Sequence, residues 1–207
     1  MRAEGPDHDA SGFFFSADYP LKSIFLLRAE LSYITLSTNA GIESGFGDFR
    51  FRVRAAVFDR NQFHLYATGA LRSGSGSNAV FPYSSGSLDV HAGIGCIDSL
   101  SQLTIWGELT AVRVSNKPGG LTEAEDHGDY AALSAGLTLL LSDQFTFHFG
   151  GSGYVLKEER SRELYFVGCD YIHSPELRFF LSLQAEGGRS DERVSDMSVR
   201  SGIRVTY

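Results

Sequence analysis

Alternating arginines are the feature of this chain best suited to contacting charged groups. In the stretch GFGDFRFRVRAAVFD, Arg50, Arg52 and Arg54 alternate with Phe51 and Val53. Because successive side chains of a β-strand point to opposite faces, three guanidinium groups share one face and apolar groups share the other. Carboxylates of the same protein could neutralise such a row. An unneutralised row could instead select anions, as rings of arginine do in pores.

Polar faces elsewhere in the chain supply the candidate partners of this row. The candidate lumen-lining and solute-selectivity residues are Arg50, Arg52, Arg54, Glu30, Arg200, Arg204, Glu108, His91, Asp170 and Arg178. In a closed barrel of sequential strands, Glu30 is expected between the arginine row and Arg200 or Arg204, and Glu108 near His91. Structural interlock by paired charges is the preferred interpretation, and a basic wall that favours anionic solutes is the alternative.

Three groups of residues have side chains that could take part in catalysis: His91 with Glu108, His148 with Asp170, and the acidic loop EAEDHGD. Hydrogen-bonded histidines and a solvated acidic surface explain them better than catalysis does. We therefore assign no catalytic residue, expect no metal and no cofactor, and keep an outer-membrane hydrolase only as a second alternative.

Ten segments of period two must position these residues. Each is close to the roughly 9 to 11 residues that a tilted strand needs to cross a bilayer. A bulge is expected near Val112. The segments are 24–36, 48–58, 63–72, 87–97, 103–114, 130–141, 145–154, 165–171, 177–186 and 197–207.

The connections between these segments alternate in length. Short turns (DRNQ, DSLS, SDQ, HSPE) follow the even-numbered segments, whereas longer polar stretches such as STNAGIESG and SGSGSNAVFPYSSG follow the others. Short turns at one end, long loops at the other and an even strand count are typical of an outer-membrane barrel. The sequence therefore predicts a ten-stranded antiparallel up-and-down transmembrane β-barrel, with both termini in the periplasm of a Gram-negative bacterium.

Bulk composition agrees with this fold. No run of about 18 apolar residues is present, and the 23 glycines and 25 phenylalanines and tyrosines favour β-structure. Aromatic residues gather toward the turn ends of the apolar face, and the chain stops on Tyr207 in the same register.

Cys96 and Cys169 fall on this face and are expected to be small apolar fillers. The net charge of −7 argues against a nucleic-acid partner. A soluble barrel with the apolar face inside is the alternative fold.

The first 22 residues lie outside the ten predicted strands. They lack a signal-peptide core, which indicates a mature form, and they contain Phe13, Phe14 and Phe15 in a row. Adjacent phenylalanines are unfavourable in water, so we expect residues 1–22 to form a periplasmic arm, a plug or a partner contact. Residues 23–207 are expected to form the barrel.

Two short motifs resemble a known family. GFGDFRFRVRAAVF and YSSGSLDVHAGIG, within residues 24–97, are similar to the outer-membrane family of the meta-pathway of phenol degradation and its uncharacterised relatives. That resemblance implies a transporter-type barrel. Together, the residues and the resemblance predict a narrow channel or uptake component for a small anionic or aromatic solute, in contact with outer-membrane lipid. A closed structural barrel that binds a protein partner through its N-terminal arm or loops is the alternative.

Overall fold

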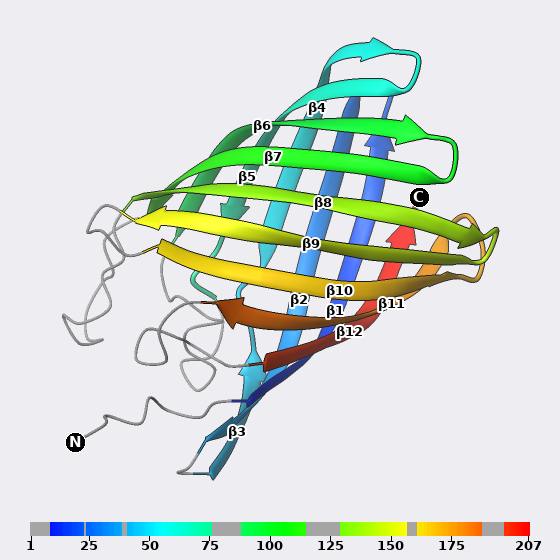
Figure 1. Cartoon of the computed structure of the whole chain (residues 1–207). Helices are drawn as coiled ribbons and strands as arrows, with labels where there is room; N and C mark the ends of the chain where they lie inside the picture. Colours follow the sequence, from blue (N-terminus) through cyan, green and yellow to red (C-terminus); the bar gives the residue numbers. More distant parts are fainter. Residues whose placement is uncertain are drawn as a thin grey trace.

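The computed structural model describes residues 9–22, 24–38, 41–75, 88–114, 129–156, 161–187 and 197–207. Within these ranges the chain is a closed antiparallel β-barrel of eleven strands plus one extra strand, and it contains no helix (Figure 1). The strands are β1 (Asp9–Leu21), β2 (Phe25–Thr38), β3 (Gly41–Phe46), β4 (Arg50–Arg60), β5 (Phe63–Arg72), β6 (Asp89–Leu100), β7 (Leu103–Val114), β8 (Tyr130–Ser142), β9 (Phe145–Leu156), β10 (Ser161–Ile172), β11 (Leu177–Gly187) and β12 (Met197–Thr206). No helix long and apolar enough to span a membrane occurs in the described ranges.

The barrel class is confirmed, but the strand count of ten is wrong. From β4 to β12 each strand pairs antiparallel with the next, and β1 closes the ring by pairing with both β2 and β12. The expectation of a separate arm or plug is therefore corrected for residues 9–21, which form a wall strand. In this strand Phe14, Ser16 and Asp18 face inward, whereas Phe13 and Phe15 are exposed. The alternation was not recognised in the sequence because three phenylalanines are adjacent.

The seam between β1 and β12 is parallel. Asp9 pairs with Met197 and Asp18 with Thr206, so both strands run from the end with long connections to the end with short turns. The first described strand thus begins at the loop end, while the last strand finishes at the turn end (Figure 1). The first and last described residues, Asp9 and Tyr207, therefore lie at opposite ends of the barrel, because an eleventh strand reverses the direction of the chain once more. The predicted periplasmic position of the N-terminus itself concerns residues 1–8, which lie outside the described residues.

The predicted loop STNAGIESG also contains a strand. Residues Tyr33 to Thr38 of β2 pair with β3, and residues Phe25 to Glu30 of β2 pair with β4. Between β3 and β4, Gly47 donates its backbone N–H to the carbonyl of Ser32 at 2.9 Å. A Cβ at Gly47 would overlap the Ser32 hydroxyl, so a larger residue here would have to displace that side chain.

Short turns connect the strands at the other end, as the sequence predicted. Asn61 and Ser101 begin two-residue turns with φ of 55° and 56°, and Lys22 adopts 58°. A positive φ at the first turn residue is the geometry that glycine usually supplies. Register shifts occur between Ala56 and Phe58 and between Leu140 and Ser142. The expected bulge near Val112 is absent, because the pairing of β7 with both of its neighbours is continuous there.

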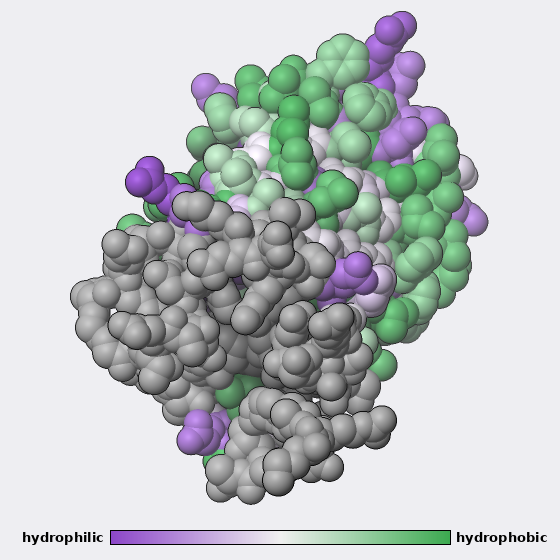
Figure 2. Space-filling model, turned by 60° about the vertical axis from the view of Figure 1, so that its left-hand side comes forward, coloured by the Kyte–Doolittle hydropathy of each residue, from purple (hydrophilic) through white to green (hydrophobic). Residues whose placement is uncertain are grey.

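The two faces of the wall differ sharply in polarity. Leu133 is 60% exposed and Phe149 50% exposed, and large apolar side chains of the other strands share this outer surface (Figure 2). An apolar surface of this extent is unfavourable in water and is the kind that a bilayer solvates. The inner face carries the charged residues. This arrangement is the opposite of a soluble barrel, in which the apolar face would fill the interior.

Candidate functional site

The barrel encloses a cavity of about 780 Å³. Eight arginines and four carboxylates line it: Arg28, Arg50, Arg52, Arg54, Arg72, Arg178, Arg200, Arg204, Glu30, Asp48, Glu108 and Asp170. Serine, threonine and aromatic side chains complete the lining together with Leu31, Ile34, Ile97, His148 and Gln184. Nine of the ten predicted selectivity residues are therefore brought together in one space. The exception is His91, which does not line this cavity.

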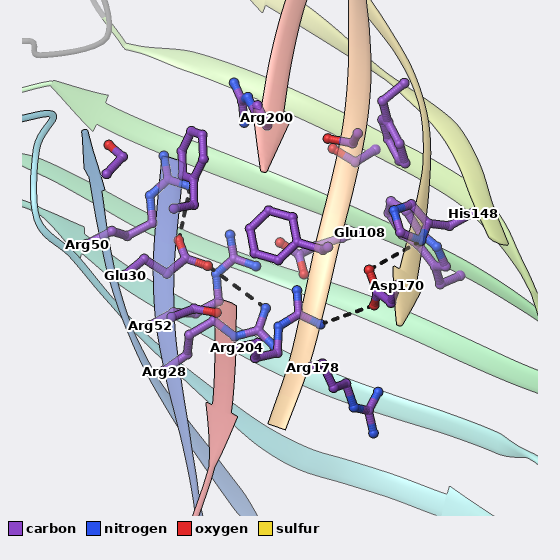
Figure 3. Close-up of a pocket in the computed structure, with 18 of the residues that line it drawn as sticks. Arg28, Glu30, Arg50, Arg52, Glu108, His148, Asp170, Arg178, Arg200 and Arg204 are labelled. Atoms are coloured by element: carbon purple, nitrogen blue, oxygen red, sulfur yellow. Dashed lines mark ion pairs between the residues drawn. The ribbon is translucent and has the colours of Figure 1, made fainter. Parts of the chain in front are cut away.

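A first cluster of charges joins β1, β2 and β4. Arg28 donates from Nε to Asp18 Oδ1 at 2.6 Å and from Nη2 to Asp18 Oδ2 at 2.8 Å. Glu30 lies 3.9 Å from Arg28 and 3.7 Å from Arg50 (Figure 3). The predicted position of Glu30 between the arginine row and β12 is only half right, because β1 separates β2 from β12.

A second cluster crosses several strands. Arg54 of β4 donates to Glu108 Oε2 of β7 at 3.1 Å, and the Tyr66 hydroxyl of β5 donates to the same oxygen at 2.9 Å. The Arg54 guanidinium also stacks over the Tyr66 ring at 4.6 Å. This reach requires Gly95 of β6, because a Cβ at Gly95 would overlap the Tyr66 ring. Within the described chain, Glu108 therefore bonds to Arg54 and Tyr66, and no hydrogen bond joins it to His91.

Two further clusters occupy the two halves of the cavity. Toward the loop end, Arg72 contacts Asp89 at 2.6 Å and Asp48 at 3.6 Å. On the other side, Asp170 of β10 lies 3.9 Å from both His148 and Arg204 (Figure 3). The predicted neighbourhood of His148 and Asp170 is thus found, at the length of a weak ion pair rather than a hydrogen bond.

The arginines outnumber the carboxylates. Asp18 and Asp89 add to the four lining carboxylates, which gives six against eight arginines among the described residues of the cavity. The excess is localised, because no described carboxylate lies within ion-pairing distance of Arg52 or Arg178. Both side chains are only partly buried and point into the cavity.

At several positions of the inner wall, an aromatic ring lies against a glycine of a neighbouring strand. Trp106 covers Gly136 and stacks with Phe166 at 6.1 Å between ring centroids. Phe14 packs beside Phe180 at 6.5 Å, and Arg200 lies over the Phe14 ring at 5.1 Å. The glycines leave space for these rings, so the wall stays thin despite its large side chains.

Three contributors to the site were missed from the sequence: Phe14, Asp18 and Tyr66. Phe14 and Asp18 belong to a strand that was not predicted, although the alternation from Gly12 to Asp18 could have revealed it. Phe13 and Phe15 lie on the outer face, so only the middle phenylalanine of the three reaches inward. The acidic loop EAEDHGD lies outside the described residues except for Asp129. No cluster of three or more potential metal ligands is present in the described part of the chain.

Comparison with known proteins identifies the fold. No protein-family model matches the sequence, and no curated protein matches it. A solved structure of the NanC porin resembles this chain with a TM-score of 0.60 and 10% sequence identity, covering 98% of this chain and 100% of that one. The chain is therefore similar in architecture to a porin barrel. Identity this low supports the shared fold, whereas the family suggested by the two short motifs is not matched.

Proposed function

We propose that this protein is a narrow outer-membrane channel whose interior favours small anionic solutes. The observation that carries the proposal is the arginine excess, located at Arg52 and Arg178 on the wall of the cavity. An unpaired guanidinium facing an aqueous lumen attracts anions and raises the barrier for cations. The apolar exterior, the likeness to a porin fold and the motif resemblance to a transporter-type family support the membrane setting.

Anion selectivity in planar bilayers tests this proposal. In a potassium chloride gradient the reversal potential of the folded protein should show preference for the anion. Arg52→Gln and Arg178→Gln should each reduce that preference, and the double variant should reduce it further. Arg60→Gln is the matched control, because Arg60 is exposed at the turn end and does not line the cavity. Cation preference, or the same selectivity in all variants, would contradict the proposal.

A closed scaffold that binds a protein partner through its loops is the second candidate. The burial of inward-facing side chains near the loop end favours it, because Ile34, Val112 and Asp89 are each at most 3% exposed. Residues 9–21 cannot serve this scaffold as a free N-terminal docking arm, because they form a strand of the wall. Absence of any conductance from folded wild type and from variants with an enlarged interior would favour this scaffold over the channel.

A further inference from the structure

Arginines lie directly opposite arginines on neighbouring strands of the barrel. Six of the eight cavity arginines form three such pairs, which are Arg28 with Arg52, Arg50 with Arg72 and Arg178 with Arg204. Residues opposite each other in a sheet have Cβ atoms about 4.5 to 5.5 Å apart, and like charges at such positions destabilise the sheet. Each pair therefore favours an anion beside it.

Carboxylates of the protein supply that anion for two of the three pairs. In the first pair Arg28 donates to Asp18 at 2.6 Å, and in the second Arg72 contacts Asp89 at the same distance. Contacts of this length between ionised groups are strong. At least one charge of each of these pairs is thus neutralised by the chain itself.

The third pair, which joins β11 to β12, lacks such a partner in the described part of the chain. Asp170 lies 3.9 Å from Arg204, beyond hydrogen-bond length, and equally far from His148 (Figure 3). No described carboxylate lies within ion-pairing distance of Arg178. The Nε atoms of Arg178 and Arg204 are buried and bond to no described atom. Two guanidinium groups therefore share one distant carboxylate.

An aromatic ring positions one member of this pair. The Arg204 guanidinium lies 5.9 Å from the centre of the Phe180 ring, and Phe180 packs beside Phe14 at 6.5 Å. A cation over a ring face is held there by the ring's charge distribution. The Arg204 side chain is still 28% exposed, and Arg178 is half-buried. Both arginines line the cavity, so a solute inside it can reach them.

Two adjacent guanidinium groups match a phosphate group better than a carboxylate. Each guanidinium presents five N–H donors in a planar fork and has no acceptor. A carboxylate carries one charge and two oxygens, which a single fork can occupy. A phosphate group has three acceptor oxygens and a charge of about −1.5 to −2 at pH 7, so it can bridge two forks. The described cavity residues comprise eight arginines and six carboxylates, and this excess of two positive charges equals the charge of one phosphate dianion.

We propose that Arg178 and Arg204 form a binding site for a phosphate group, and that the solute of this barrel is inorganic phosphate or a small phosphate monoester. The inference rests on the proposed channel function and names its solute class. Arg178 is the second residue of β11 and Arg204 the third from the end of β12, so the site lies near the turn end of the cavity. Asp170 competes with the phosphate for Arg204.

Isothermal titration calorimetry of the folded, full-length barrel in an uncharged detergent measures this binding without requiring conductance. Inorganic phosphate and glycerol 3-phosphate are the two probes, and binding of only one of them assigns the free ion or the ester. Acetate at the same ionic strength should bind at least about tenfold more weakly, because it cannot bridge both forks. Arg178→Gln and Arg204→Gln should each weaken phosphate binding about tenfold or more.

Arg52→Gln is the matched control for position. It removes the same charge from the same cavity, but β4 is four strands away from β11 around the ring. Phosphate binding should weaken less than in Arg178→Gln, because only a long-range attraction is lost. Arg60→Gln, outside the cavity, should leave the binding unchanged. Asp170→Asn should strengthen it, because Arg204 loses the competing carboxylate.

Urea unfolding separates a binding role from a structural one. Without phosphate, Arg178→Gln should not lower the urea midpoint, since the substitution removes a repulsion between neighbouring strands. Phosphate should raise the midpoint of wild type, because a ligand of the native state stabilises that state. Heat-dependent gel mobility confirms that each variant is folded.

Several outcomes would overturn the site. Folded wild type that binds neither probe would exclude it. Equal losses in Arg52→Gln and Arg178→Gln would show that the general charge of the cavity attracts the anion. Acetate that binds as tightly as phosphate would exclude the solute class, and unchanged or weaker binding in Asp170→Asn would contradict the competition for Arg204.

Failure of the channel function has a different signature. If phosphate binds as expected but bilayer currents are absent or prefer cations, the anion channel is wrong and the binding site stands. If the currents prefer anions but neither phosphate probe binds, only the phosphate site is wrong.

Discussion

The Arg28–Asp18 pair connects β1 to β2. Substituting Arg28 should lower the free energy of unfolding more than substituting Asp18 does. Two hydrogen bonds of 2.6 and 2.8 Å join the groups, and the side chains are 17% and 8% exposed. Removing one partner of a buried pair costs about 3 to 5 kcal/mol. Because Arg28 retains some exposure, we expect Arg28→Met to lower the free energy of unfolding by about 3 kcal/mol, the low end of that range.

Asp18→Asn should cost less, about 1 to 2 kcal/mol, because Arg28 keeps Glu30 as a second carboxylate at 3.9 Å. Among the described residues, Asp18 has no second cationic side chain within ion-pairing distance. In the double variant no buried charge is left unpaired, so the combined loss should be at least about 1 kcal/mol smaller than the sum of the single losses.

Urea unfolding in detergent gives the measurement. Trp106 is the only tryptophan, and it stacks on Phe166 inside the barrel, so its fluorescence reports the loss of the folded wall. Arg60→Met is the control for removing an exposed arginine. A cost of Arg28→Met below about 1 kcal/mol, or below that of Asp18→Asn, would show that the pair behaves as a solvated surface pair.

Three further substitutions or labels test separate features. Gly95→Ala should destabilise the barrel by about 1 to 3 kcal/mol in the same assay, because its Cβ overlaps the Tyr66 ring, whereas Gly153→Ala meets nothing within 4 Å and should be neutral. Equal effects of the two would contradict the ring-on-glycine packing. Ser101→Gly should stabilise by about 1 kcal/mol, since φ is 56° there, and a loss of stability would exclude strain at this turn. Cys169 is unpaired and exposed on the outer face, so in lipid vesicles an uncharged maleimide should label it faster than a charged thiol reagent, and equal rates would place it in water.

Local patterns were sufficient to predict most of the wall. Alternation at Arg50, Arg52 and Arg54 identifies both the strand and its inward face, and the cavity lining agrees. Turn-forming residues such as Asn61 mark the hairpins correctly. These features depend on neighbours in sequence, which is the information that a single chain carries directly.

Features that depend on closure were not predictable in the same way. The Arg54–Glu108 contact reaches from β4 to β7, and pairing rules for adjacent strands do not anticipate it. Ile34 and Leu36 are buried on the inner face of β2, the face that also carries Arg28 and Glu30, and alternation alone does not predict that change in polarity. The position of β1 between β2 and β12 follows from the geometry of the completed ring, and it also decides the strand count.

The parallel seam also bears on the order in which the barrel assembles. Pairings elsewhere in the wall join strands that are close in sequence, so their hairpins form after small losses of chain entropy. Pairing of Asp9 with Met197 instead brings together nearly the whole length of the described chain, and contacts of such high sequence separation form slowly. Completion of the ring is therefore the expected late step of folding. At Gly202 a Cβ would overlap the backbone of Phe14, so a larger residue there would block the pairing of β1 with β12.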